Sequence, residues 1–376
     1  MQRILVVGAS LAGIRAAEAL RRRGFDGELT VAGAEPDVPY RRPALSKGYL
    51  LGIQSQDQIG LSVDADLDVR TGTEAVRLDL GSRVVWLRRD GRPAVAHRFD
   101  GLVIATGAVA RTLPGPSLPG VHTLRTLADA AALRSDLLAA TQVVIAGGGL
   151  VGGEVAAAAR LLGLDVTLVV PAPGPMAGIF GPAVARMLAE LHLAHGTRLT
   201  PGAVAGLEGD SRVRAVRLAD GTVLPADLVV LGIGSRPATG WLYGSGLIGP
   251  GGRLRHAPNL AVADGITAAG DVIAAPGAGH WDNAVQQAET AARTLLDGPA
   301  APAHDALTMF WTELYGTRLQ MIGHPAPGAA TRLAEGSLGD GRCVVTYGDG
   351  TAAAALLVNS PHRLSTYRRL LSAVAA

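Results

Sequence analysis

Short apolar runs alternate with segments of helical spacing over the first 35 residues of the chain. Residues 3–7 form a mainly apolar run bounded by Gly8, which is typical of a buried parallel strand. Residues 11–24 place apolar side chains at helical spacing and end in a basic stretch closed by Gly24, which predicts a helix with a glycine stop. Residues 27–35 form the next apolar run, so the pattern predicts a β-α-β unit.

The same pattern returns once, over residues 141–170. A strand, a glycine-rich turn, an alanine-rich helix and a second strand follow one another there. Residues 99–114 and 225–239 also resemble each other, and each is expected to end its own half of the fold. Two such units predict two mononucleotide-binding folds rather than a short-period repeat protein.

A different pattern follows these units. Residues 283–298 have helical spacing, and residues 298–304 are rich in Pro and Ala, which is typical of a linker. Residues 319–325 and 342–359 predict strands with a hairpin turn at 348–350, and residues 360–375 predict a final helix. We therefore expect a separate α+β domain at this end.

Composition excludes several classes of protein. The chain has 376 residues, enough for two or three domains, and its net charge of +2 does not indicate nucleic-acid binding. Cys343 is the only cysteine, which excludes a CxxC redox pair, a disulfide within the chain and a cysteine-based zinc site; no metal is expected. No secretory signal or membrane span is visible, so we expect a cytoplasmic protein with no membrane partner.

The first glycine-rich turn has the spacing of a dinucleotide-binding loop. Gly8 and Gly13 stand at the tight turn and the helix–strand contact, and the small Ser10 stands where the backbone approaches a pyrophosphate. Glu35 follows at the distance of an acid that binds a ribose 2′-OH. The alternatives are a plain strand–helix turn and a loop carboxylate.

The second turn matches the pattern more fully. Gly147, Gly149 and Gly152 fill all three glycine positions ahead of a helix whose N-terminus attracts a pyrophosphate. Glu154 is expected in the first helical turn, where a carboxylate could simply complement the helix dipole. Two loops indicate two dinucleotides, and the economical pair is FAD with a nicotinamide nucleotide.

Five further segments carry a family resemblance: PYRRPALSK (39–47), ATGAVARTLPG (105–115), AAGDV (268–272), HWDNAVQQ (280–287) and FWTELYGTRLQMIG (310–323). Together they resemble the oxygenase-coupled, FAD-dependent NAD(P)H–ferredoxin reductases, which are similar to putidaredoxin reductase. The resemblance implies an α/β, glutathione-reductase-like fold with two Rossmann-type dinucleotide-binding domains. It implies an FAD-binding domain (1–109 and 248–302), an NAD(P)H-binding domain (110–247) and a C-terminal α+β interface domain (303–376).

The resemblance also implies roles for single residues. Gly8, Gly13 and Glu35 would bind the ADP half of FAD. Lys47 would lie near flavin N5, with Glu154 pointing toward it, and Trp281 would face the nicotinamide or the electron acceptor. The remaining residues of the FAD cleft would be Arg42, Pro43, Thr106, Gly107, Asp271 and Val272.

Lys47 is also singled out without the resemblance, because it is the only lysine in an arginine-rich chain. An ammonium near flavin N5 and O4 would stabilise negative charge on the ring. The alternatives are an exposed lysine at 47, ordinary core packing for Trp281 and a helix cap for Asp271.

Three departures from the family concern the nicotinamide or the flavin edge. Val170 stands where relatives usually carry an acid, and residues 273–279 form a shorter segment in which Gly279 replaces a Glu. Glu313 and Leu314 stand where the family commonly reads Asp-Gln. Without an acid at 170 or an Arg in 171–180, we expect weak discrimination between NADH and NADPH, or a domain that is only a scaffold.

Three functions follow from these observations. The first is transfer of electrons from NAD(P)H through FAD to a small acidic ferredoxin, for which Arg293, Arg318, Arg368 and Arg369 are candidate docking residues. The second is a flavoenzyme that acts directly on a small organic substrate, and the third is a non-catalytic FAD-binding protein. A monomer and a homodimer are both compatible with the sequence.

Overall fold

The computed structural model describes residues 1–115, 118–273 and 279–375. The chain divides into two compact units. Unit 1 comprises Met1–Arg41, Ile59–Val109 and Arg236–Thr308, and unit 2 comprises Arg42–Gln58, Ala110–Ser235 and Met309–Ala376. The three-domain division expected from the sequence stays a prediction.

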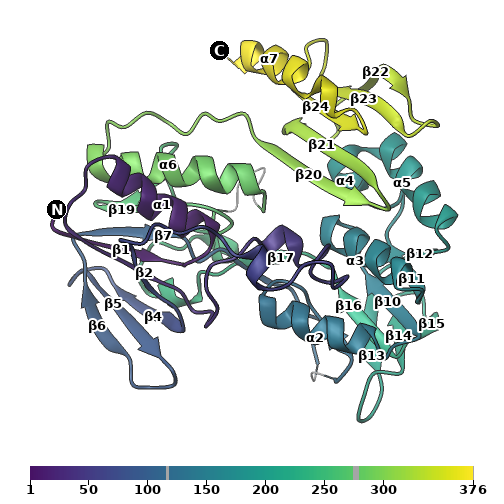
Figure 1. Ribbon diagram of the computed structural model, residues 1–376, viewed down its shortest axis with the longest axis horizontal. Helices are drawn as coiled ribbons and strands as arrows, with labels where there is room; N and C mark the ends of the chain where they lie inside the picture. The colour runs from purple at the N-terminus through teal and green to yellow at the C-terminus, as the bar shows by residue number, and fades with distance from the viewer. Residues whose placement is uncertain (116–117, 274–278, 376) are drawn as a thin grey trace. The chain divides into compact units, whose positions relative to one another are not determined.

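The core of unit 1 is a six-stranded sheet with the order β18-β19-β7-β1-β2-β3 (Figure 1). Strand β1 lies at its centre and pairs in parallel with both β2 and β7. The chain therefore leaves β1 toward one edge and returns on the other side, which makes a topological switch point between β1 and β7. The strands are β1 (Arg3–Val7), β2 (Glu28–Ala32), β3 (Asp68–Arg70), β7 (Gly101–Ile104), β18 (Ala261–Ala263) and β19 (Ile266–Ala268).

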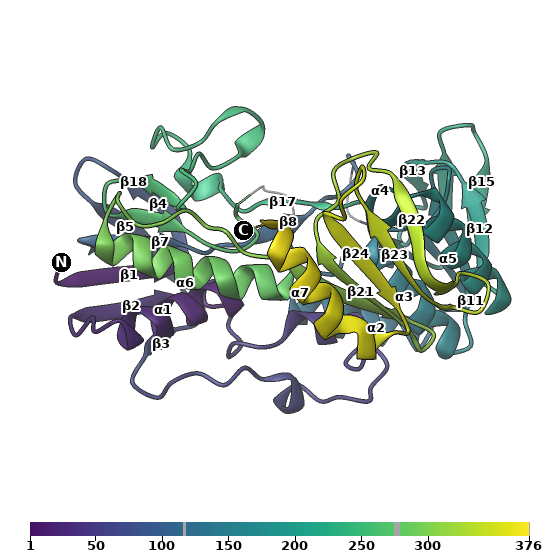
Figure 2. The ribbon, with the colours of Figure 1, turned by 90° about the horizontal axis from the view of Figure 1, so that it is seen from above.

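Helices α1 (Leu11–Arg22) and α6 (Trp281–Asp297) lie side by side in unit 1 (Figures 1 and 2). Their buried faces are rich in alanine, which allows close packing. A separate three-stranded antiparallel sheet consists of β4 (Thr73–Asp79), β5 (Val84–Arg89) and β6 (Val95–Arg98). The short helices of this unit are η2 (Asp57–Ile59, at its boundary), η3 (Gly240–Leu242) and η4 (Pro250–Gly252).

Unit 2 repeats the parallel arrangement in a five-stranded sheet with the order β12-β11-β10-β16-β9. Strand β10 is central and pairs in parallel with β11 and β16, so a second switch point lies between β10 and β16. The strands are β9 (Val121–His122), β10 (Gln142–Ala146), β11 (Asp165–Val170), β12 (Arg198–Pro201) and β16 (Leu228–Leu231). The other elements around this sheet are η1 (Arg42–Ala44), α2 (Leu127–Leu137), α3 (Leu150–Leu161), α4 (Ala177–Phe180), α5 (Pro182–Ala194), β13 (Val204–Glu208), β14 (Ala215–Leu218) and β15 (Val223–Pro225).

The last part of the chain forms an antiparallel sheet with the order β20-β21-β24-β23-β22 and a final helix (Figure 2). Burial alternates along the edge strand β20, so one face packs inward and the other is open. The expected hairpin is present, since β23 pairs with β24 across residues 348–353. The elements are β20 (Met309–Leu314), β21 (Thr317–Gly323), β22 (Thr331–Ser337), β23 (Arg342–Tyr347), β24 (Ala354–Val358), η5 (Pro361–Arg363) and α7 (Leu364–Ala375).

The predicted fold class is confirmed: two Rossmann-type sheets are followed by an α+β segment. The sequence analysis missed both small antiparallel sheets, β4–β6 and β13–β15, and it missed α2 and α5. Strands β8 (Ala108–Ala110) and β17 (Ser235–Pro237) pair where the chain passes between the units. Within the described residues, no helix combines the length and the apolar character needed to cross a membrane.

Candidate functional site: two glycine-rich turns and a buried ion pair

The first glycine-rich turn lies at the carboxyl end of β1, at the switch point of unit 1. A Cβ on Gly8 would stand 2.1 Å from the carbonyl oxygen of Ala105, and one on Gly13 would stand 1.7 Å from that of Gly8. Both positions therefore require glycine, because a side chain cannot approach a backbone oxygen so closely. Ser10 is the N-cap of α1, so the turn presents the helix N-terminus as a pyrophosphate loop does.

Other predicted FAD residues lie around this turn. Glu35 lies beyond the end of β2, and its carboxylate accepts a hydrogen bond from the hydroxyl of Tyr40. Thr106 Oγ1 donates to the carbonyl of Ala238 at 2.8 Å, and the Gly107 carbonyl accepts from the Ala238 amide at 2.9 Å. The two predicted cleft residues are thereby fixed to the segment that leaves β17.

The segment that carries Asp271 comes close to the same turn. A Cβ on Gly270 would stand 2.8 Å from Cβ of Ala12, which lies between Ser10 and Gly13. Asp271 Oδ1 accepts a hydrogen bond from the Gly279 amide at 2.9 Å. The neighbouring Val272 is fully buried.

Trp281 is the first residue of α6 and is half-buried against the core of unit 1. The shortened segment 273–279 lies mostly outside the described residues, which include only its two ends. The structure therefore places Trp281 in unit 1 together with the first glycine-rich turn, and its predicted role at the flavin edge stays a prediction.

The second glycine-rich turn repeats the geometry of the first in unit 2. A Cβ on Gly147 would stand 2.5 Å from the carbonyl oxygen of Gly232, and one on Gly152 would stand 1.9 Å from that of Gly147. Gly149 is the N-cap of α3, and no atom of the described residues comes within 4 Å of a Cβ placed there. This turn thus combines two closely packed glycines with one that faces open space, as nucleotide binding requires.

Val170, at the end of β11, packs against the second glycine-rich turn and is buried. It is 6% exposed, and its Cγ2 lies 3.0 Å from the position of a Cβ on Gly148. Pro175 contacts the same position, and the Met176 amide donates to the Gly148 carbonyl at 2.8 Å. The chain has no Asp or Glu between Asp165 and Glu190, so no acid stands at this strand end in place of Val170.

Glu154, which is buried, and Lys47, which is partly buried, form an ion pair in unit 2. Lys47 Nζ lies 2.7 Å from Glu154 Oε1, and the two side chains are 21% and 6% exposed. Helix α3 begins at Leu150, so Glu154 is its fifth residue, and the expected first-turn position was wrong. The helix starts only after its N-cap Gly149, and Glu154 therefore points into the protein, away from the free N–H groups of the first turn.

Two hydroxyl groups complete the surroundings of this carboxylate. Ser46 Oγ donates to Glu154 Oε2, and Thr312 Oγ1 donates to Oε1 at 2.6 Å. A buried carboxylate is costly unless it is paired and hydrogen-bonded, and these donors meet that need. Neither Ser46 nor Thr312 was predicted as a site residue from the sequence. Its position next to Lys47 could have indicated Ser46, but nothing in the sequence indicates the contact from Thr312.

Trp311 is a third residue of this site that was not predicted from the sequence. Its ring centroid lies 4.9 Å from Lys47 Nζ and 5.7 Å from Cζ of Arg318, and the residue is 41% exposed. Lys47 Nζ also donates to the Pro43 carbonyl at 3.3 Å, and Arg42 donates to the Arg125 carbonyl at 2.5 Å. The Pro43 carbonyl therefore contacts the Lys47 ammonium, whereas the Arg42 side chain binds a different segment of unit 2.

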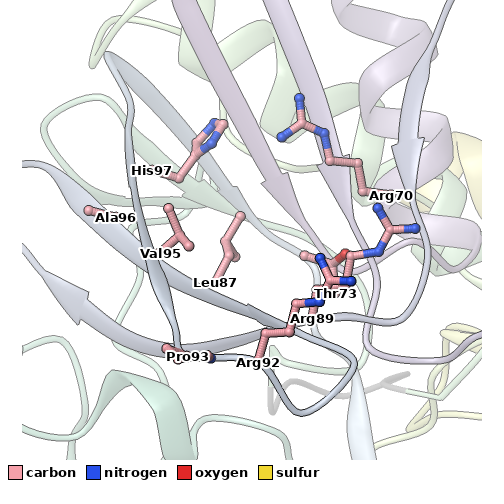
Figure 3. Close-up of a pocket in the computed structure, with 9 residues that line it drawn as sticks. All are labelled: Arg70, Thr73, Leu87, Arg89, Arg92, Pro93, Val95, Ala96 and His97. Carbon is pink, nitrogen blue, oxygen red and sulfur yellow. The ribbon is translucent and has the colours of Figure 1, made fainter.

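A hollow of about 370 Å³ in unit 1 is lined by both basic and apolar side chains, among them Arg70, Arg89 and Leu87 (Figure 3). Its lining includes Arg70, whose carbonyl accepts from the Gly33 amide, next to the strand end that precedes Glu35. Burial and the charge of Arg70 lower the pKa of His97 on another wall. None of the predicted site residues lines this hollow.

Comparison with known proteins decides the family. The family model described as pyridine nucleotide-disulphide oxidoreductase matches residues 2–288. The chain belongs to the pyridine nucleotide-disulphide oxidoreductase family. A second model of this kind of reductase, described as reductase C-terminal, matches residues 309–376. As a member with Cys343 as its only cysteine, which is free and buried, the chain forms no internal redox disulfide.

Within this family the chain is similar to ferredoxin reductases over nearly its whole length. Rhodocoxin reductase from Rhodococcus erythropolis is 35% identical, covering 98% of this chain and 89% of the relative. The biphenyl dioxygenase system ferredoxin–NAD(+) reductase component of Paraburkholderia xenovorans is 36% identical, covering 98% and 92%. The reductase in the covalent putidaredoxin reductase–putidaredoxin complex matches with a TM-score of 0.89 and 30% identity, covering 98% and 93%. The family resemblance expected from the sequence is confirmed.

Proposed function

We propose that this protein is an FAD-dependent oxidoreductase that passes electrons from NAD(P)H through the flavin to a small iron–sulfur protein. The observation that carries the proposal is the ion pair between Lys47 and the buried Glu154, which lies on the helix behind the second glycine-rich turn. Relatives named as ferredoxin reductase components support the same activity over almost the full chain.

The residues of unit 1 fit an FAD molecule. A Cβ on Gly8 or on Gly13 would meet a backbone oxygen, and the N-terminus of α1 that follows Ser10 would be suited to a pyrophosphate. Glu35, already oriented by Tyr40, would accept from the ribose hydroxyls, and Asp271 would bind the ribityl chain. When bound, FAD accepts two electrons as a hydride and releases them one at a time.

Lys47 would supply fixed positive charge where negative charge develops during the reaction. Glu154 orients the Lys47 ammonium through the ion pair. The ring of Trp311 contacts the same ammonium and limits its access to water. Hydride transfer needs no catalytic acid or base, so none is assigned. Single electrons would then leave to the iron–sulfur partner.

The choice between NADH and NADPH follows from the end of β11. A ribose 2′-OH would find no carboxylate near Val170, and a 2′-phosphate would find no arginine in residues 171–180. We infer that the Gly147–Gly152 turn binds the pyrophosphate shared by both cofactors and that discrimination between them is weak.

The electron acceptor would be acidic, because exposed arginines lie on the C-terminal segment. Arg318 is on β21 beside Trp311, and Arg368 and Arg369 are exposed on α7. Arg293 is on α6 of unit 1, where its Nη2 donates to the Pro302 carbonyl at 3.2 Å, so it is a weaker candidate. The feature that favoured direct action on an organic substrate, the short segment 273–279, lies mostly outside the described residues.

Anaerobic titration tests this proposal. The purified protein should be yellow with non-covalently bound FAD, and its visible absorbance should be lost on mixing with NADH or NADPH. A folded, colourless protein that cannot be reconstituted with FAD would contradict the proposal. Retention of colour with both nucleotides would instead favour a non-catalytic FAD-binding protein.

A further inference from the structure

We propose that Thr312 and Ser46 are positioning residues that hold the Glu154 carboxylate in the orientation in which it pairs with Lys47. The inference rests on the proposed function for its catalytic consequence, but not for its geometry. It gives the C-terminal sheet a direct part in setting the charge at the reacting centre.

The geometry is a carboxylate with three partners from two other segments. Thr312 Oγ1 and Lys47 Nζ both approach Oε1, at 2.6 and 2.7 Å, while Ser46 binds Oε2. Thr312 is fully buried, and Ser46 and Glu154 are each 6% exposed. With both oxygens engaged, the carboxylate plane cannot rotate without breaking a charge-assisted hydrogen bond.

The two hydroxyls come from segments far apart in sequence. Ser46 belongs to residues 42–58, next to Lys47 itself, and Thr312 belongs to β20 of the C-terminal sheet. The neighbouring Trp311 contacts the lysine on its other side. Two consecutive residues of β20 therefore touch both members of the pair, Thr312 from the buried face of the strand and Trp311 from the exposed one.

Replacing Thr312 by Val keeps the shape of the side chain but turns a methyl group toward Oε1. The Glu154 carboxylate loses one charge-assisted hydrogen bond and rotates away from the methyl group. The Lys47 ammonium then pairs less closely with the carboxylate and is more exposed to a reagent. The change predicts faster reaction of the Lys47 amine with an acylating reagent, by roughly tenfold, which is the low end of the contribution of one charge-assisted hydrogen bond.

Because Lys47 is the only lysine, this reactivity can be measured without assaying the enzyme. The purified holoprotein is labelled briefly with an amine-acylating reagent, and the peptide that contains Lys47 is quantified by mass spectrometry, with the α-amino group of Met1 as internal reference. Thr312→Val and Ser46→Ala should both be labelled faster than wild type, and Thr312→Ser should restore the wild-type rate. Thr346→Val is the matched control, since Thr346 lies on β23 of the same sheet and its Oγ1 donates to the Arg332 carbonyl at 3.4 Å rather than to Glu154.

A second readout separates positioning from plain stability. The rate constant for loss of flavin colour with NADH should fall in Thr312→Val and recover in Thr312→Ser, at temperatures where all variants are folded. Wild-type labelling rates in both Thr312→Val and Ser46→Ala would overturn the inference, as would a lower melting temperature with an unchanged rate constant. If wild type itself is not reduced by NADH or NADPH, the proposed function fails, and the labelling experiment still decides the geometry.

Discussion

A methyl group at Gly149 is expected to separate nucleotide binding from folding in unit 2. No atom of the described residues lies within 4 Å of the new Cβ, and the backbone at φ −75° and ψ −172° is open to any residue. Gly149→Ala should therefore lower the free energy of unfolding by no more than about 1 kcal/mol, the cost of Ala in place of Gly at a helix N-cap. The same space is where a pyrophosphate would approach the helix N-terminus, so the nucleotide would meet the methyl group.

The neighbouring Gly152 gives the opposite expectation. Its Cβ would stand 1.9 Å from the Gly147 carbonyl oxygen, whereas Cβ contacts under 3.0 Å essentially do not occur. Helix α3 must therefore shift by more than 1 Å from that oxygen, at a cost on the order of 3 kcal/mol for overpacking. Gly152→Ala should lower both the melting temperature and nucleotide binding.

The assay is a titration of FAD-loaded protein with NADH, beside urea unfolding of each variant. Overpacking by one methyl group costs about 1–3 kcal/mol, so the apparent dissociation constant of Gly149→Ala should rise roughly fivefold to a hundredfold. Gly206→Ala is the control, because its Cβ also meets nothing within 4 Å of the described residues and it lies on β13, away from the turn. An unchanged affinity in Gly149→Ala would refute the assignment of this turn to the nucleotide.

Three further outcomes are expected. Lys47→Ala should keep FAD but slow its reduction by about tenfold to a thousandfold in stopped flow, as loss of one stabilising charge does; an unchanged rate would remove the lysine from the mechanism. Val170→Glu should favour NADH, since one charge-assisted hydrogen bond contributes about 1.5–3 kcal/mol; titration of both nucleotides checks this, and a strong NADH preference in wild type would contradict it. Burial, with the nearby charge of His195, lowers the pKa of His192 from 6.5 to about 4, so its contribution to stability is fully present above pH 6.5 and is lost as the pH falls toward 4. Urea unfolding should show about 1.6 kcal/mol of this loss between pH 6.5 and 5, and His192→Phe should reduce it; an equal loss in both proteins would refute the assignment.

The glycine-rich turns could be predicted from sequence because their requirement is local. Gly13 and Gly152 lie against the carbonyl oxygens of Gly8 and Gly147, residues only five positions earlier in the chain. Spacing alone therefore fixes the contact. The apolar strands before and after each turn were predicted for the same reason.

The surroundings of Val170 could not be predicted in this way. Its contact with Gly148 depends on the parallel register of β10 and β11 and on the return of residues 171–176 over the turn. In unit 1 the glycine is on the other strand: Gly33 stands at the position of Val170, and Ala9 stands at the position of Gly148. A Cβ on Gly33 would lie 2.5 Å from the Cβ of Ala9. Gly148 thus accommodates Val170, which explains a third consecutive glycine that the loop pattern does not require.

The hydroxyl partners of Glu154 could not be predicted from the sequence either. Thr312 is 158 positions away and reaches the carboxylate only because β20 packs on α3. The resemblance to ferredoxin reductases implied the contact with Lys47, but spacing gives no information on a hydroxyl from another sheet. The small antiparallel sheets were missed because their strands are short and partly exposed, so their apolar pattern is weak.

Double-mixing stopped flow tests the central claim most directly. FAD-loaded protein is first mixed anaerobically with a stoichiometric amount of NADH or NADPH and then, after the flavin colour is lost, with an oxidised acidic [2Fe–2S] ferredoxin. The proposed function predicts that flavin absorbance returns while the ferredoxin is reduced, with two ferredoxins reduced per flavin and a rate that falls as salt is raised. Loss of colour in the first mixing without transfer to ferredoxin in the second, at any salt concentration, would contradict the claim that this protein is a ferredoxin reductase.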